Sequence, residues 1–429
     1  MIVEYRIHRL ARLAKADPNK RFNRLFREIA RPDFLMFAFE QIKDNKGSNT
    51  PGVDGKTKRH WSLSEAAHVA ESLRNGTYRP TPVRRVYITK KNGKLRPLGI
   101  PTFTDRVVQS AIKLVLEALY EPIFLDSSHG FRPSRACHTA LNVICDNPST
   151  RIDWVVEGDI KGFFDNVAHQ VLMQLLHKRI SDDRFLHLIA KFLKAGYFER
   201  EMWNPTRKGT PQGGIVSPVL ANIYLHELDK YVAEKYGTDM DYKQTRDEVR
   251  KRVNPEYEKI RSKLSFIRKI LSGKLTSPQS EAELRAQLRE CLKRRKAIPY
   301  LSEPIKPIIA YVRYADDWVI TLRNLPKAKA EEIKNDITAW VTENLRLELS
   351  PEKTLVTHIT DGFIFLGHKI MSAKRKQGRS QPQVKMVVPH DSVRAKIVAI
   401  RMVCRHCHRP EIEVLRGVNS ILTGWMDFY

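Results

Sequence analysis

The chain has 429 residues and a formal net charge of +27, with 42% hydrophobic and 29% charged residues. This length suits two or three coupled lobes, and the hydrophobic content excludes a disordered chain. So large an excess of positive charge predicts a polyanionic partner, with nucleic acid first and a membrane surface second. No apolar run reaches the length of about 18 residues that would span a bilayer, so we expect no membrane partner.

The N-terminus is rich in arginine and lacks the apolar segment of a secretory leader. Five cysteines in a chain of this size fit a reducing compartment. We therefore expect a cytoplasmic protein of bacterial type, associated with nucleoid or ribonucleoprotein. An organelle is the alternative location, although Glu4, Asp17 and Glu28 are unusual for a transit peptide.

Residues 1–45 carry apolar side chains at helical spacing between arginines and lysines, which predicts basic amphipathic helices. Pro32 is typical of a first helical turn and restarts the pattern. A loop rich in glycine, proline and asparagine follows over 45–55, and a further helix is predicted over 62–75. The basic helices suit either packing against a core with one solvated face or contact with RNA.

Residues 83–100 carry the clearest hairpin pattern in the chain. Alternating β-forming residues meet at Asn92-Gly93, a dipeptide favoured in type I′ turns. The alternation places Lys90 and Arg96 on one face near the tip, where two cations suit a triphosphate. An ordinary charged surface hairpin fits the pattern as well. A long amphipathic helix is predicted from Asp105 onward.

Two later segments carry polar groups at the ends of elements. The apolar strand WVVEGD delivers Asp159 at its C-terminal end, a place where function often collects in open sheets. A flexible loop over 209–216 then opens a helix, and its paired glycines allow a ligand to approach the backbone closely. Gln212 offers an amide at that point, although glycines alone indicate only a turn.

Residues 308–322 place Asp316 and Asp317 between two runs of β-forming residues. The runs predict two strands, and Ala-Asp-Asp between them predicts a tight turn. Adjacent acidic residues are equally typical of a plain surface turn. Charges among apolar strands are nevertheless costly without a cation, and Mg²⁺ binds through one or two carboxylates plus substrate phosphates. Together with Asp159, the pair predicts a divalent-cation site.

Seven segments, in this order, resemble the reverse transcriptases encoded by group II introns, which also act as maturases. The segments are RPLGIPTFTDR (96–106), HGFRPSR (129–135), EGDIKGFFDNV (157–167), GTPQGGIVSPVLANIYLHELD (209–229), RYADD (313–317), SPEKT (350–354) and FLGHKI (365–370). NKGSNTPGVDG (45–55) is similar to that family's N-terminal extension. The resemblance covers almost the whole chain, and the combination is specific although each motif alone is weak.

The resemblance implies an α+β chain with the right-hand architecture of polymerases: fingers, a palm with an antiparallel sheet, and a helical thumb. In that family the positions of Asp159, Asp316 and Asp317, with the backbone of Ile160, bind two Mg²⁺ ions, and Mn²⁺ is an alternative ion. One ion lowers the pKa of the primer 3′-hydroxyl, and the other stabilises the leaving pyrophosphate.

Further matching positions imply contacts with the incoming dNTP. Lys90 and Arg96 would hold the triphosphate, Gln212 would line the nucleotide pocket, and Phe164 would lie beneath the sugar. Lys353 is the implied proton donor to pyrophosphate, although an ordinary surface lysine fits the sequence equally well. FLGHKI resembles the hairpin that grips the primer.

The implied domain order is an N-terminal extension (1–60), fingers (61–150), a palm (151–370) and the start of a thumb (371–429). Within the palm, residues 236–307 form a Lys- and Arg-rich insertion, for which we expect contact with intron RNA rather than a merely solvated excursion. By comparison with the family pattern, we expect this part to be only the beginning of a thumb, either because the chain is truncated or because the protein is naturally short. Cys404 and Cys407 lack the second half of a four-ligand zinc site.

We therefore predict an RNA-directed DNA polymerase that extends a DNA primer on an RNA template with dNTPs. It would also bind group II intron RNA and assist splicing and mobility. A splicing maturase with little polymerase activity is one alternative, but the YADD motif and Gln212 are both present. A host-domesticated enzyme of phage defence or CRISPR spacer acquisition is the other, and the N-terminal extension and basic insertion favour the intron form.

Overall fold

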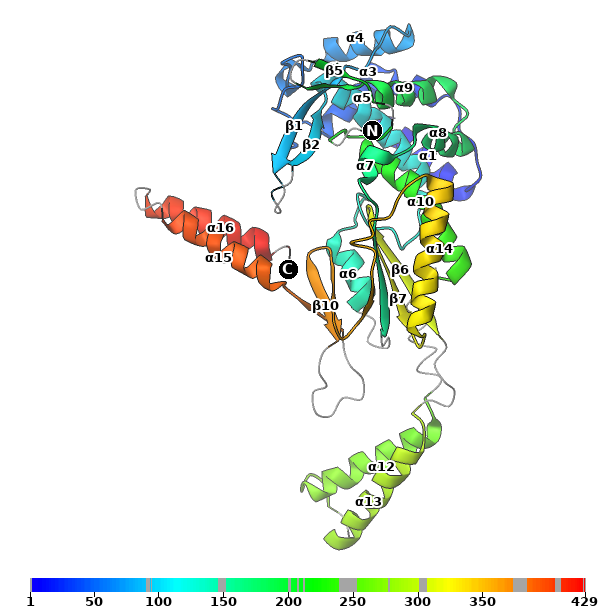
Figure 1. The fold of residues 1–429 in the computed structure, drawn as a ribbon, viewed down its shortest axis with the longest axis vertical. Coiled ribbons are helices and arrows are strands. Elements are labelled where there is room, and N and C mark those ends of the chain that lie inside the picture. Colours follow the sequence, from blue (N-terminus) through cyan, green and yellow to red (C-terminus); the bar gives the residue numbers. More distant parts are fainter. Residues whose placement is uncertain are drawn as a thin grey trace.

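The computed structural model describes residues 2–89, 93, 95–145, 152–199, 202–206, 208–210, 213–238, 253–276, 278–300, 307–372, 384–405, 410–426 and 428. Within these ranges, helices combine with mostly antiparallel sheets, so the chain is of the α+β class. Figure 1 shows a helix-rich N-terminal part, a central sheet next to it, and two helical pairs that extend away from the sheet. No helix in the described ranges has the length and apolar character needed to cross a membrane.

The N-terminal part packs around α5 (Phe103–Tyr120), most of whose side chains are buried. The helix is amphipathic, as predicted, but polar side chains such as Gln109 and Ser110 are buried along with its apolar ones, which suits a helix enclosed by others. The surrounding helices are α1 (Ile2–Ala16), α2 (Leu25–Ile29), α3 (Pro32–Glu40), α4 (Leu63–Arg74), α8 (His169–Arg179) and α9 (Asp183–Lys194). The prediction of helices before Pro32 was wrong at Phe22, which lies outside a helix and forms a β-bridge with Ile180.

The predicted hairpin over 83–100 is confirmed as β1 (Val83–Thr89) and β2 (Leu95–Ile100), an antiparallel pair. Ile88 lies opposite Arg96 in this register. The short strands β4 (Tyr197–Glu199) and β5 (Met202–Asn204) extend the sheet, because β4 pairs with β1 in parallel. We call this four-stranded unit the hairpin sheet.

The central sheet contains only antiparallel pairs and has the order β6-β7-β3-β8. Its strands are β6 (Ile308–Tyr314), β7 (Asp317–Arg323), β3 (Trp154–Asp159) and β8 (Val356–His358). One face joins the main core with α10 (Ser217–Tyr236) and α14 (Lys327–Leu345). The other face packs on α6 (Cys137–Cys145) and on a small sheet of β9 (Phe363–Phe365), β10 (His368–Ser372) and β11 (Val384–Val387). FLGHKI therefore forms a hairpin, as predicted.

Close packing inside the central sheet explains one glycine of the EGD motif. A Cβ atom on Gly158 would lie 2.1 Å from the indole ring of Trp318, which is opposite it on β7. The ring therefore occupies the space that any side chain at position 158 would need.

Two helical pairs project from the body (Figure 1). The first, α12 (Pro255–Leu271) and α13 (Glu281–Ala297), has a small core of its own that is separate from the other two cores. The second, α15 (His390–Cys404) and α16 (Glu411–Met426), contains no fully buried residue. Three short helices complete the described elements: η1 (Lys58–His60), η2 (Glu121–Ile123) and α7 (Phe163–Asn166).

Candidate active site

Three carboxylates meet at one end of the central sheet. Asp159 is the last residue of β3 and lies directly opposite Asp317, the first residue of β7. Asp316 and Ala315 form the two-residue turn between β6 and β7. Asp317 was predicted to lie in the turn, but this residue pairs with Tyr314 within the strands. The strand pairing thus brings the three predicted carboxylates together.

Two of the three carboxylates, those of Asp316 and Asp317, have raised pKa values. Partial burial and the neighbouring Asp316 and Asp159 carboxylates raise the pKa of Asp317 to about 7. Burial also raises the pKa of Asp316, and Asp159 contributes in the same direction, whereas Arg96 and Lys353 oppose the increase. A group that resists ionisation beside like charges is a candidate for binding a cation.

Lys353 is brought to this cluster by the SPEKT turn. The backbone amide of Ser350 donates to the Asp159 carbonyl, which fixes the turn against the end of β3. The Nζ atom of Lys353 then lies 2.9 Å from Oδ2 of Asp159. This bond raises the pKa of Lys353, whose side chain is 65% exposed, so the ammonium faces open space on its other side. The structure therefore places Lys353 beside the carboxylate cluster, and its role as a proton donor stays a prediction.

The donor atoms of the cluster suit a hard divalent cation, because they are all carboxylate oxygens. Within the described ranges, however, no three Asp, Glu, His or Cys side chains are grouped as a formed metal site. Lys353 instead supplies the positive charge next to Asp159. Ile160, whose backbone was predicted as a further ligand, is buried and forms a β-bridge with Leu349. The carboxylate oxygens are therefore suitable ligands for a cation. Their side chains are not, however, arranged as a formed binding site in the described part of the chain.

A cavity of about 440 Å³ lies between the hairpin sheet and the segment after β3. Phe164 lines it together with Arg85, Pro97 and Thr210. The preceding Phe163 is only 2% exposed and belongs to the main core. Phe164 is therefore the ring of this pair that a ligand can reach.

The other predicted nucleotide contacts are only partly described. Arg96 is exposed on β2 and acts electrostatically on Asp316, but it is not among the residues that line the cavity. Lys90 and Gln212 lie outside the described residues, so their predicted roles stay predictions.

The loop before α10 is held from both sides. The amide of Thr210 donates to the carbonyl of Phe164, and the amide of Ile215 donates to Oε1 of the buried Gln109. Between them, Gly213 has φ +108°, and a Cβ there would lie 2.4 Å from the Gly99 carbonyl oxygen. Gln109 was not identified from sequence, because its position on an amphipathic helix carries no sign of this bond.

Comparison with known proteins decides the family. Residues 88–254 match the family model described as reverse transcriptase (RNA-dependent DNA polymerase). The chain is 38% identical to the group II intron-encoded protein LtrA of Lactococcus lactis subsp. cremoris, over 99% of this chain and 73% of that protein. The chain belongs to the group II intron-encoded reverse transcriptases.

Two further relatives are similar to this chain: one is matched over almost its full length, and the other is named an intron maturase. Protein YkfC of Escherichia coli (strain K12) is 35% identical over 92% of this chain and 94% of its own length. The mitochondrial nuclear intron maturase 4 of Arabidopsis thaliana is 24% identical over 86% of this chain and 42% of its own length. As a member of this reverse transcriptase and maturase family, the protein is an RNA-directed DNA polymerase, and its family uses divalent metal ions.

A buried ion pair lies directly behind the carboxylates of this reverse transcriptase, and it was not predicted from the sequence. Arg313 of the RYADD motif pairs with Asp229 of α10, and both side chains are 0% exposed. A signal was present for Arg313, which lies in an otherwise apolar strand pattern, but not for Asp229, which has Glu227 and Lys230 beside it. Nothing in the sequence, however, indicates that residues 84 positions apart are partners.

Proposed function

We propose that the protein is a right-hand polymerase that copies RNA into DNA with two Mg²⁺ ions held by Asp159, Asp316 and Asp317. The observation that carries the proposal is the strand register that sets Asp159 opposite Asp317, next to Asp316 in the turn. Primer extension on an RNA template by variants without the Asp316 and Asp317 carboxylates tests it, and loss of cDNA synthesis is expected.

In the proposed nucleotidyl transfer, the aspartates bind the cations and Lys353 donates a proton. Bound divalent ions supply charge neutralisation of the phosphoryl group and activation of the primer hydroxyl. Asp159, Asp316 and Asp317 hold and orient them, with the Ile160 backbone as a further ligand. Lys353 lies at hydrogen-bonding distance from Asp159 and carries a proton on Nζ that the departing pyrophosphate needs.

Substrate contacts follow from the cavity and the hairpin sheet. Phe164 lines the cavity and would lie beneath the sugar of the dNTP. The positive charge of Arg96 acts against the increase in the pKa of Asp316, so this arginine lies near the carboxylates. Arg96 would hold the triphosphate together with Lys90. Gln212 would complete the nucleotide pocket from the loop that precedes α10.

The domain order that we propose assigns 1–60 to an N-terminal extension, 61–150 to fingers, 151–370 to a palm and 371–429 to the start of a thumb. The antiparallel central sheet supports the palm assignment, because it carries the carboxylates. The paired helices α15 and α16 support the thumb assignment. We further propose intron RNA as a partner, in addition to the RNA template and DNA primer.

The helical pair α12/α13 is the surface that we propose for contact with intron RNA. It lies inside the basic insertion 236–307, has its own core, and projects away from the central sheet (Figure 1). Arg289, Lys293 and Lys296 recur at helical spacing on α13 and are all exposed. Exposed cations at this spacing suit the regularly spaced phosphates of a structured RNA.

Replacing residues 238–305 by a short Gly/Ser linker should weaken the binding of structured RNA and flatten its salt dependence. Each lost phosphate contact lowers the slope of log K against log salt by about one. Primer extension on a simple template should continue, because the pair does not contribute to the main core. Filter binding at several salt concentrations measures the effect.

A matched variant keeps the fold of the pair and removes only charge. Arg289→Gln, Lys293→Gln and Lys296→Gln together should reproduce part of the change in slope, whereas Glu281→Gln on the same helix should not reduce it. Indistinguishable affinities and slopes for the linker variant and the wild type would show that the insertion is only a solvated excursion.

A further inference from the structure

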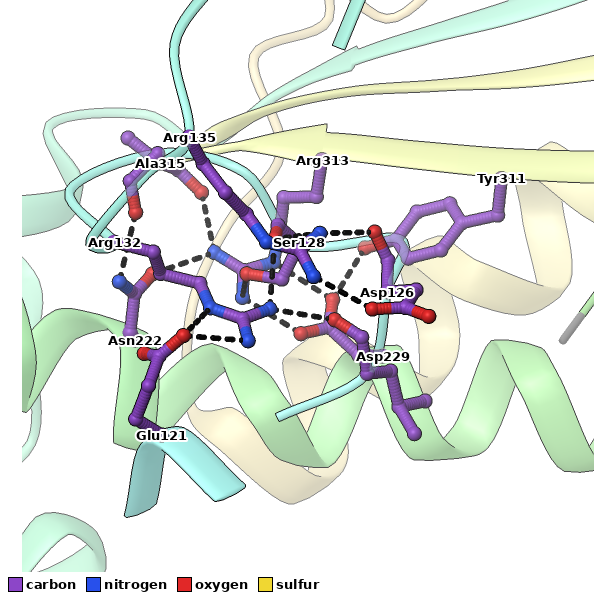
Figure 2. Close-up of polar contacts among 12 residues, drawn as sticks. Glu121, Asp126, Ser128, Arg132, Arg135, Asn222, Asp229, Tyr311, Arg313 and Ala315 are labelled. Carbon is purple, nitrogen blue, oxygen red and sulfur yellow. Dashed lines mark hydrogen bonds and ion pairs between the residues drawn. The ribbon is translucent and has the colours of Figure 1, made fainter. Parts of the chain in front are cut away.

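The guanidinium of Arg313 has a complete set of hydrogen-bond acceptors behind the catalytic turn (Figure 2). Its Nε and Nη2 donate to the two carboxylate oxygens of Asp229 at 2.7 and 2.6 Å. Nη2 also donates to Oγ of Ser128 at 2.7 Å, and Nη1 donates to Oδ1 of Asn222 at 3.2 Å and to the Ala315 carbonyl at 2.8 Å. All five N–H donors of an arginine are therefore used.

The bond to Ala315 acts directly on the turn that carries the carboxylates. Ala315 has φ +56°, in the left-handed region that an alanine rarely adopts. This conformation persists only where its surroundings enforce it. Arg313 holds the carbonyl of this residue from inside the protein, and Asp316 and Asp317 follow next in the chain.

A second contact fixes the turn from the other side. Gly130 lies so close that a Cβ there would be 2.3 Å from the Ala315 amide nitrogen. The carbonyl of Gly130 accepts a hydrogen bond from Nδ2 of Asn222 at 2.8 Å. The amide of His129 donates to the Arg313 carbonyl at 2.8 Å, so the HGFRPSR segment lies along β6 at this point.

The HGFRPSR segment is itself braced by two arginines. Arg132 pairs with Glu121 and donates to the carbonyls of Leu125 and Ser128. Arg135 pairs with Asp126 and also donates to the Ser128 carbonyl (Figure 2). These bonds tie the segment behind the catalytic turn to the residues that precede it in the chain.

The same network reaches α10, the helix that follows the loop over 209–216. Asn222 and Asp229 lie seven residues apart on α10, and therefore on one face of that helix. α10 begins where the loop over 209–216 ends. Arg313 thus joins the catalytic turn, the HGFRPSR segment and the helix that follows the loop over 209–216.

We infer that Arg313 is a positioning residue for DNA synthesis: it fixes the Ala315 turn so that Asp316 and Asp317 present their carboxylates to the cations. The inference rests on the proposed role of these two aspartates. Stability alone gives little reason for the arrangement, because a buried ion pair often adds no more stability than apolar residues of the same volume. A fully bonded guanidinium does, however, impose one geometry on the groups around it.

Arg313→Lys tests the inference, because lysine keeps the charge but has three donors on one nitrogen instead of a planar fork. Single-nucleotide incorporation is measured in the pre-steady state, where the burst amplitude counts active enzyme. We expect a rate constant per active site about 10- to 100-fold lower, as for a misplacement of about 1 Å. The Mg²⁺ concentration for half-maximal rate should rise about tenfold, as when a group that orients a ligand is lost. Primer–template affinity should stay within twofold.

Tyr224→Phe is the matched control on the same helix. Its hydroxyl is buried and donates to the Leu345 carbonyl at 2.6 Å, away from the turn. This variant should lower the melting temperature without moving the Mg²⁺ midpoint. Asn222→Ala provides a milder change in the network if Arg313→Lys yields no folded protein, and it should raise the midpoint severalfold.

The positioning role would be overturned if the variant that folds keeps the wild-type rate constant and Mg²⁺ midpoint within twofold. It would equally be overturned if Tyr224→Phe shifted the midpoint as far as the network variants do. Failure of the proposed function is a separate result: in that case a variant without the Asp316 and Asp317 carboxylates would itself continue to synthesise cDNA.

Discussion

Replacing both Asp316 and Asp317 by asparagine should abolish cDNA synthesis while leaving RNA affinity nearly intact. The change removes two of the three carboxylates that meet at the end of the central sheet. The substitutions remove several kcal/mol of charge stabilisation from the transition state. The rate of DNA synthesis should therefore fall by a factor of at least about a thousand. We expect RNA binding to depend mainly on phosphate contacts elsewhere on this chain, because its net charge is +27. Extension of oligo(dT) on poly(rA) with Mg²⁺ and filter binding of RNA measure the two properties.

Asp361→Asn is a suitable control for the double substitution. Asp361 is an exposed aspartate outside the carboxylate cluster, and the same chemical change there should leave extension unaffected. Substantial extension by the double variant would show that these carboxylates do not hold the catalytic ions.

Phe164→Val should raise the incorporation of ribonucleotides relative to deoxyribonucleotides by about tenfold or more. A ribonucleotide differs only by its 2′-hydroxyl, and a ring beneath the sugar excludes that group by overlap. Relief of a clash of about 1.4 kcal/mol corresponds to a tenfold change in preference. The structure places Phe164 on the wall of a cavity, in edge-to-face contact with Phe131 and Phe163. Single-nucleotide incorporation with matched rNTP and dNTP measures the preference.

The neighbouring Phe163 provides an internal control. Its ring is buried in the main core against Tyr224, so Phe163→Val should lower the free energy of unfolding by about 1–3 kcal/mol. Sugar preference should not change. If Phe164→Val kept wild-type discrimination and Phe163→Val lost it, the assignment of the two rings would be reversed.

Local patterns in the sequence predicted the elements that carry the site. The hairpin over 83–100 follows from alternation around Asn-Gly, and β3 follows from its apolar run. The β6–β7 hairpin follows in the same way, although Asp317 lies in the strand and not in the turn. These predictions succeeded because each depends on residues that are close together in the chain.

The contacts that organise the site depend on residues far apart in the chain, and the sequence did not predict them. Lys353 and Asp159 are 194 positions apart, so sequence alone left Lys353 as either a surface residue or a functional one. The partners of Arg313 on α10 and the HGFRPSR segment were likewise not evident, because family resemblance marked these motifs without indicating what they touch. The separate core of α12/α13 was not predicted either, because it forms between residues of two different helices.

The most direct test of the catalytic centre is the location of Mn²⁺ by anomalous diffraction. The crystal would contain the protein, an RNA template, a DNA primer without a 3′-hydroxyl, and a matching dNTP. We predict two ions, about 4 Å apart, with the carboxylate oxygens of Asp159, Asp316 and Asp317 about 2.2 Å from them. Ions bound to the dNTP without any of these three carboxylates, or carboxylates with no ion beside them, would contradict the account.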